Sequence, residues 1–304
     1  MKKSVVLIVL TALALAVNAA THVVGTYNIR IATKRDAGDK NWAVRKPFVA
    51  QTITDNRLDI LSLNEIANHT QEDDLRALLP DYTLVAYGRE SAEASHGERV
   101  GVLFKTTKYT LLDSGHFFLT ENPDQPGLAW DAAYKRVAVW VLLQDKRSRE
   151  ELLVMSTHLD YKGTEARRQG AVLCIGRAQA LAQGRTAIIM GDLNAEPYET
   201  DVHSLFADAD FHDARQISRT KPRGTYGTFS NWLPVATTQR IDFIYVRNAS
   251  VRSYRVIAED YGRPLLPSDH RLVVIKMTPP PPSKRGLCLT LFTGKLHAGR
   301  KITR

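Results

Sequence analysis

Apolar residues recur along the chain with two different spacings, and these spacings predict more strands than helices. The expected strands cover residues 23–31, 59–63, 83–87, 100–105, 109–112, 136–143, 152–157, 186–190, 241–246, 251–258 and 272–277. The expected helices cover residues 45–56, 73–79, 164–183 and 200–207. Because these helices are dispersed among the strands, we expect an α+β fold with two packed sheets and helices on the outside.

The first residues have the pattern of an export signal. Lys2 and Lys3 precede an uncharged apolar run over residues 5–17, and Ala19 offers a small residue at a cleavage point. The run is shorter than the roughly 20 residues of a membrane-spanning helix. We therefore expect residues 1–19 to be a signal peptide, with export to the periplasm or the cell exterior and no stable membrane anchor after cleavage. A buried N-terminal strand or an uncleaved anchor is the alternative.

A run of four prolines at residues 279–282 marks the expected end of the folded domain, which would span residues 20–278. The basic tail at 279–304 is expected to be a mobile appendage. Cys174 and Cys288 are the two cysteines of the chain, so it is no disulfide scaffold. We expect two unpaired thiols, with a disulfide between them as the alternative.

The net charge first suggests a nucleic-acid-binding protein, because 41 basic and 32 acidic residues give 41 − 32 = +9. Eight of the basic residues, however, lie in the signal and the tail: Lys2, Lys3, Lys284, Arg285, Lys295, Arg300, Lys301 and Arg304. Without them the balance is 33 − 32 = +1. The body is therefore close to neutral, and its overall charge does not favour nucleic acid as a ligand.

Polar side chains stand at or near the ends of six predicted strands. They are Asn28, Glu65, His158, Asp192 with Asn194, Asp242, and Asp269 with His270. Each of them alone has a structural explanation, such as a hydrogen-bonded core amide, a helix-start carboxylate or a turn. Burying such groups singly costs several kcal/mol. One shared site would explain the whole set.

The chemistry of this set points to phosphoryl transfer to water. Carboxylate and amide oxygens suit Mg²⁺ or Mn²⁺, and two lone cysteines make a thiolate zinc site improbable. A metal would polarise a phosphoryl oxygen, an aspartate would orient the attacking water, and imidazoles would stabilise the transition state.

Seven sequence blocks in this order resemble the endonuclease/exonuclease/phosphatase superfamily, which has the deoxyribonuclease I-like fold. The blocks are TYNIR (26–30), LNEI (63–66), RVGVLFK (99–105), STHLD (156–160), GDLNAEP (191–197), RIDFIYV (240–246) and PSDHRLVV (267–274). The segment 115–143 resembles small secreted bacterial members related to the deadenylase branch. The resemblance implies a four-layer α/β/β/α sandwich with two mostly antiparallel sheets.

The resemblance also implies a role for each residue. Glu65 and Asn28 would bind the metal, and Asp269 would assist a metal. Asp192 would position or deprotonate the water, and Asn194 and His158 would stabilise the phosphate in the transition state. His270 would contact the phosphate and be oriented by Asp242. Arg30 and Arg136 would clamp the phosphate, with surface arginines on strands as the alternative. Asn64 stands where the family often has Gln, behind the metal ligands.

We therefore expect an exported, metal-dependent phosphoesterase that acts by in-line attack of water, most simply as a monomer. A nuclease acting on RNA or DNA is favoured by segment 115–143. A phospholipid or sphingomyelin phosphodiesterase would need an exposed apolar loop, and residues 229–235 with Trp232 are the candidate. A small phosphate-ester phosphatase is the third alternative. A binding protein without turnover would have lost Asp192 or His270, and both are present.

Overall fold

The computed structural model describes residues 20–91 and 97–280, which form two stacked sheets of six strands each. Across the first sheet the order is β11 (Ser250–Val256), β12 (Val273–Thr278), β1 (His22–Asn28), β2 (Ile60–Ala67), β4 (Glu98–Lys105) and β3 (Tyr82–Gly88). Across the second it is β5 (Tyr109–Phe118), β6 (Val137–Asp145), β7 (Glu151–His158), β8 (Thr186–Asp192), β10 (Asp242–Arg247) and β9 (His212–Asp213). The pairs β1–β2 and β7–β8 are parallel and all other pairs are antiparallel.

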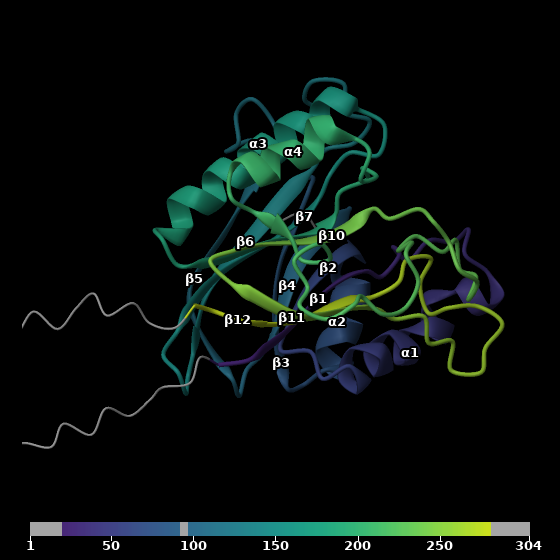
Figure 1. The fold of residues 1–304 in the computed structure, drawn as a ribbon. Coiled ribbons are helices and arrows are strands. Elements are labelled where there is room, and N and C mark those ends of the chain that lie inside the picture. Colours follow the sequence, from purple (N-terminus) through teal and green to yellow (C-terminus); the bar gives the residue numbers. More distant parts are fainter. Residues whose placement is uncertain (1–19, 92–96, 281–304) are drawn as a thin grey trace, which may run out of the picture.

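The helices lie on the two outer faces (Figure 1). Helices α1 (Trp42–Asp55) and α2 (Asn68–Leu78) cover the first sheet, and α3 (Thr164–Ala182) and α4 (Thr200–Asp208) cover the second. A short 3-10 helix, η1 (Gly38–Lys40), precedes α1. The predicted α+β fold with four α/β/β/α layers is confirmed.

Central strands bury both of their faces, which is why they read as continuous apolar runs in the sequence. In β2, Ile60 points between the sheets, whereas its neighbour Leu61 packs under the outer helices. In β8, Ile188 points between the sheets and Ile189 packs under α3 and α4. This two-sided burial fixes the register of the strands and therefore the positions of the residues at their ends.

Several predicted boundaries were wrong, and one strand was missed. Strand β1 ends at Asn28 rather than at residue 31, and β2 continues to Ala67 rather than ending at 63, so Glu65 lies within β2. Helix α2 begins at Asn68 rather than at residue 73, because the Gln71 side chain accepts hydrogen bonds from the Ala67 and Ala32 N–H groups and holds the chain at the helix start. Strand β5 continues to Phe118 rather than stopping at 112, through a bulge in its pairing with β6. The short strand β9 was not expected.

The predicted signal segment lies outside the described residues, as do the tail from residue 281 onward and Cys288. Cys174 is fully buried in α3 as a free thiol, and burial raises its pKa to about 12. None of the helices in the described part of the chain has the length and apolar character to cross a bilayer.

His22 begins β1, at the end of that strand opposite to Asn28, and is fully buried. Its Nδ1 atom lies 2.7 Å from the Tyr109 hydroxyl. Burial and the nearby Lys108 ammonium lower the pKa of His22 from 6.5 to about 4. The unfolded chain therefore binds a proton at this position at a higher pH than the folded chain does.

Stability should consequently fall as the pH drops from 6.5 toward 4, because the folded-state pKa of His22 is depressed. The full effect of His22 is at most about 3 kcal/mol. Replacing His22 by Gln removes this titration and keeps hydrogen-bonding capacity. Urea unfolding at pH 7 and at pH 4.5 should show a smaller loss of stability in the variant than in the wild type. Parallel losses in the two proteins would rule out this source of acid sensitivity.

Candidate active site

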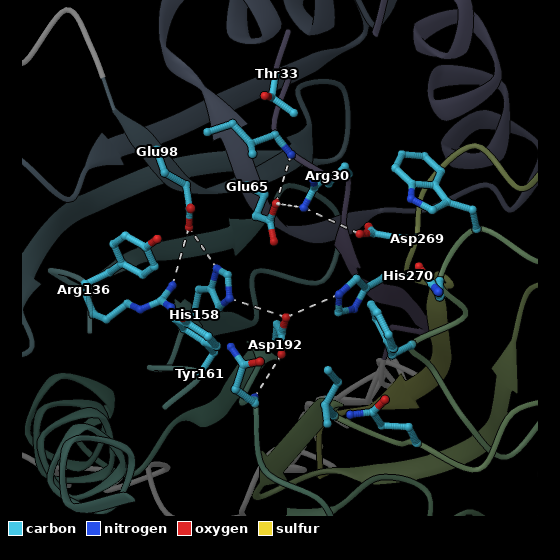
Figure 2. Close-up of a pocket in the computed structure, with 18 of the residues that line it drawn as sticks. Arg30, Thr33, Glu65, Glu98, Arg136, His158, Tyr161, Asp192, Asp269 and His270 are labelled. Atoms are coloured by element: carbon cyan, nitrogen blue, oxygen red, sulfur yellow. Dashed lines mark hydrogen bonds and ion pairs between the residues drawn. The ribbon is translucent and has the colours of Figure 1, made fainter. Parts of the chain in front are cut away.

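The ends of four parallel-paired strands bring side chains from both sheets together (Figure 2). The Asn28 side-chain amide nitrogen, at the end of β1, donates to Glu65 Oε1 at 2.9 Å and to Asp192 Oδ2 at 3.1 Å. Glu65 belongs to β2 in the same sheet, whereas Asp192 ends β8 in the other sheet. One buried amide thus joins the proposed metal ligand to the proposed water-activating carboxylate.

Asn64 makes a second connection between the sheets. Its amide nitrogen donates to the Thr157 carbonyl at 3.1 Å, and its amide oxygen accepts from the Asp192 N–H at 2.9 Å. The next residue, Glu65, has φ of +58° and lies where the pairing of β2 with β4 is interrupted. This left-handed conformation is unfavourable for a non-glycine residue, so the surrounding structure stabilises it.

The turn after β8 requires a glycine and an asparagine. Gly191 has φ of +150°, and an added Cβ would lie 1.8 Å from the Thr157 carbonyl oxygen. Asn194 has φ of +48°, its N–H donates to Asp192 Oδ1 at 2.9 Å, and its side chain donates to the Leu159 carbonyl at 3.0 Å. The turn therefore fixes Asp192 from one side while β7 fixes it from the other.

His270 lies between two carboxylates. Its Nδ1 atom is 2.8 Å from Asp242 Oδ2, and its Nε2 atom is 3.6 Å from Asp192 Oδ2. Burial alone would lower the pKa of this ring, but the carboxylates of Asp242 and Asp192 raise it well above 6.5. Both carboxylates favour the protonated form of His270, in which both ring nitrogens are donors and can bind negative oxygens.

His158 occupies the opposite side of Asp192, at 3.5 Å between Nε2 and Oδ2. Its Nδ1 atom lies 2.9 Å from Glu98 Oε1, a residue that the sequence did not single out. Although burial favours the neutral form of Glu98, His158, Arg136 and Arg89 lower its pKa to about 2. Its only sequence signal was an acid directly before the block RVGVLFK.

Arg136, a predicted phosphate clamp, lies just before β6 and is largely buried. Its guanidinium lies 3.7 Å from Glu98 Oε1 and 3.4 Å from Asp160 Oδ2. Asp160 also accepts hydrogen bonds from four backbone N–H groups, those of Ala133, Tyr134, Lys162 and Gly163. Asp160 therefore ties two loops to this wall of the site, a role that sequence reasoning missed.

Glu65 and Asp269 have the donor chemistry that a divalent cation needs. Burial and the Glu65 carboxylate raise the pKa of Asp269, whereas the neighbouring His270 lowers it and so offsets part of this increase. An Arg30 guanidinium nitrogen lies 4.0 Å from Glu65 Oε2 and 3.8 Å from Asp269 Oδ2, so a cation already stands beside both carboxylates. The oxygen atoms of Glu65, Asp269 and Asn28 have the donor chemistry of a site for a hard divalent cation, and Asn28 Oδ1 also accepts from the Arg30 N–H at 3.0 Å.

A different group, formed by Asp192, Asp242 and His270, has ligand atoms within 4.8 Å of one another. In this group both nitrogens of His270 already face carboxylates, those of Asp242 and Asp192. The family roles of all these residues, including Asp192, Asn194 and His158, remain predictions.

A cavity of about 660 Å³ opens onto these groups. Its lining combines the catalytic cluster with Thr33, Arg35, Arg89, Tyr134, Tyr161, Phe229, Asn231, Trp232 and Gln239. Trp232 is only 4% exposed and lies against the Arg45 guanidinium, 5.4 Å from its ring centre. The ring of Trp232 is therefore buried, whereas Leu233 and Val235 of the candidate loop at 229–235 are 46% and 56% exposed.

A model of the Endonuclease/Exonuclease/phosphatase family matches residues 25–270. The chain belongs to this family. Its members are phosphoesterase hydrolases, so the predicted enzyme class holds. No curated protein sequence matches the chain significantly.

Solved structures agree with this membership. The family protein from Bacteroides vulgatus is 32% identical, with a TM-score of 0.80 over 86% of this chain and 100% of that one. A mannosyl-6-phosphatase from Bacteroides thetaiotaomicron is 28% identical, with a TM-score of 0.79 over 84% of this chain and 99% of that one. The human Nocturnin catalytic domain with bound sulfate shares the fold at 20% identity, with a TM-score of 0.66 over 86% and 95% of the two chains.

Replacing Glu98 by Gln should lower turnover by about 10- to 100-fold, because His158 loses its charged partner while Arg136 keeps Asp160. Steady-state kinetics and thermal unfolding would be measured together. Glu151, at the opposite end of β7 from His158 and paired with Arg185, gives the matched control in Glu151→Gln, which should leave turnover unchanged. Equal activity of the two variants would contradict a role for Glu98 in orienting His158.

Proposed function

We propose that this family member hydrolyses phosphate monoesters of small, hydroxyl-rich molecules such as sugar phosphates. The supporting observation is the cavity, whose volume of about 660 Å³ suits a small substrate. Its outer wall carries Thr33, Asn231 and Gln239, which can exchange hydrogen bonds with hydroxyl groups. The similarity to a mannosyl-6-phosphatase at 28% identity supports the same substrate class.

The proposed reaction is in-line attack of water on phosphorus, in which a new P–O bond forms, the ester P–O bond breaks, and the departing sugar oxygen takes up a proton from solvent. Asp192 Oδ2 faces Asn28, His158 and His270 and would orient the water, accepting its proton. His270, as an imidazolium, would donate to a phosphoryl oxygen while Asp242 holds the ring. Asn194 would donate from the turn that carries Asp192. A divalent cation at Glu65, Asn28 and Asp269 would supply polarisation of the phosphoryl group.

Arg30 and Arg136 have different proposed roles in this reaction. Both line the cavity, but Arg136 is held between two carboxylates, whereas the Arg30 side chain is about one third exposed. Arg30 also donates to Asp36 Oδ2 at 3.1 Å. We propose that Arg30 contacts the substrate phosphate and that Arg136 mainly positions Glu98 and Asp160.

A nuclease remains the second candidate, which one feature of the cavity favours. The rings of Tyr134 and Tyr161 stack with centres 5.7 Å apart, and each residue is 48% exposed. Exposed aromatic rings beside a phosphoryl-transfer site can stack on nucleobases. The body charge of 33 − 32 = +1 argues against tight binding of a duplex.

We further propose that the protein is exported, on the basis of the sequence pattern of its first 19 residues, and that it acts as a monomer. Mass spectrometry of the protein recovered from the periplasm or medium would test the first point, since cleavage after Ala19 leaves a chain beginning at Ala20. Retention of the full chain in the cytoplasm would contradict it.

Asp192→Ala and His270→Ala should each reduce turnover by about 10²–10⁴-fold, because the water and the phosphate each lose a positioned partner. Thermal unfolding would show that the variants remain folded. His212→Ala gives a control, because His212 is exposed and lies outside the cavity. Wild-type turnover in either active-site variant would overturn the mechanism.

Removal of divalent cations with EDTA should abolish activity, and Mg²⁺ or Mn²⁺ should restore it. Glu65→Gln should raise the Mg²⁺ concentration needed for half-maximal activity, because the site loses a charged oxygen ligand. Full activity of the wild type in EDTA would exclude the proposed cation requirement.

The substrate class can be tested with a panel of mannose 6-phosphate, p-nitrophenyl phosphate, bis-p-nitrophenyl phosphate and single-stranded RNA, each with Mg²⁺. We expect the highest kcat/KM for the sugar monophosphate. Cleavage of RNA with no release of phosphate from the sugar ester would select the nuclease instead.

A further inference from the structure

A second hollow, separate from the active-site cavity, is lined by residues of strands β11 and β12. These two strands lie next to each other at the edge of the first sheet (Figure 1). The hollow has a volume of about 500 Å³. It is lined by Thr220, Arg223, Arg252, Ser253, Tyr254, Arg255 and Lys276. Four of these residues carry a positive charge, none carries a negative charge, and none lines the active-site cavity.

Backbone pairing forces these cations together. The segment before Gly224 runs beside β11, where the Arg223 N–H donates to the Tyr254 carbonyl at 3.0 Å and the Val256 N–H donates to the Arg223 carbonyl at 2.9 Å. Arg223 therefore stands directly opposite Arg255. On the other side of β11, Ser253 pairs with Lys276 of β12, so Lys276 lies diagonal to Arg255.

Gly224 holds this segment in place. Its φ is +87°, and an added Cβ would lie 2.0 Å from the Val256 carbonyl oxygen. The close approach of the two backbones is therefore specific, and the Arg223–Arg255 juxtaposition is a fixed feature of the fold rather than a choice of side-chain conformers.

These cations differ from most arginines near the catalytic centre. Arg30, Arg89 and Arg136 all lie within ion-pair distance of carboxylates. Within residues 20–91 and 97–280, by contrast, no carboxylate lies within ion-pair distance of the four cations that line the hollow. Arg255 has only a long hydrogen bond of 3.4 Å to Asn56 Oδ1. Like charges on neighbouring strands destabilise a sheet, so this cluster costs stability that an anion would restore.

We propose that this hollow binds a compact ligand with two or three adjacent phosphate groups. Four cations around one small space match the charge of such a ligand, because each phosphate group carries about one to two negative charges near neutral pH. Arginine also recognises phosphate with paired N–H donors. The site is independent of the proposed catalytic activity, since the two cavities share no lining residue.

Isothermal titration calorimetry with inorganic tripolyphosphate, in EDTA, tests the proposal on the full chain. The variant Arg252→Ser/Lys276→Ser should bind at least tenfold more weakly than the wild type. Both side chains are exposed, so the fold should persist, as measured by thermal unfolding. Turnover of p-nitrophenyl phosphate, where the wild type shows it, should be unchanged in this variant.

The matched control is Lys146→Ser/Arg147→Ser, which removes the same two charges from the exposed turn between β6 and β7. Its affinity for tripolyphosphate should stay within twofold of the wild type. Equal weakening in both double variants would show a general charge effect and overturn the site. Undiminished binding in Arg252→Ser/Lys276→Ser would also overturn it, since the anion would then bind elsewhere.

Further probes identify the source of the phosphate groups. ATP that binds as tightly as tripolyphosphate supports recognition of the phosphates alone, and tighter binding of ATP supports a nucleotide. Binding of an oligothymidylate that depends on Arg252 and Lys276, with none of tripolyphosphate, would overturn the compact ligand in favour of an extended polyanion.

Discussion

The Asn28 amide is the contact on which the catalytic arrangement depends. Its nitrogen donates to Glu65 in the same sheet and, across the sandwich, to Asp192 in the second sheet. Both carboxylates would repel each other if they faced one another directly, and a neutral donor between them reduces this cost. The relative position of the two sheets therefore determines the distance between the group that would hold a metal and the group that would hold the water.

That distance is protected by rigid packing on both sides of the site. Asn64 joins the sheets a second time through the Thr157 carbonyl and the Asp192 N–H. Between the sheets, apolar residues such as Ile60 and Ile188 pack closely and keep the strands from sliding. The left-handed backbone conformation of Glu65 and Asn194 is unfavourable by itself. The close packing around these residues maintains it.

Much of this arrangement could be predicted from the sequence, because it depends on which polar residues stand near the ends of the predicted strands. Asn28, His158 and Asp192 end their strands and Glu65 lies two residues before the end of β2, and parallel pairing brings the ends of β1 and β2, and those of β7 and β8, side by side. Glu98 and Asp160 could not be recognised in this way. They act on His158 and Arg136 across the cavity wall, and such side-chain contacts depend on how loops fold rather than on strand periodicity. The predicted start of α2 was wrong for the same reason, because Gln71 accepts a hydrogen bond from the N–H group of Ala32, which is distant in the sequence.

The division between strands and loops also separates chemistry from substrate choice. The residues proposed to act on phosphorus lie near strand ends, in the turn after β8 or in the segment just before β12, where the sheets fix their positions. Thr33, Asn231 and Gln239, by contrast, lie on connecting segments that line the outer cavity. Loops tolerate change without loss of the core, so one catalytic centre can serve different esters when these segments differ. Family membership therefore establishes the reaction class, and only the loop residues of this chain carry information about its substrate.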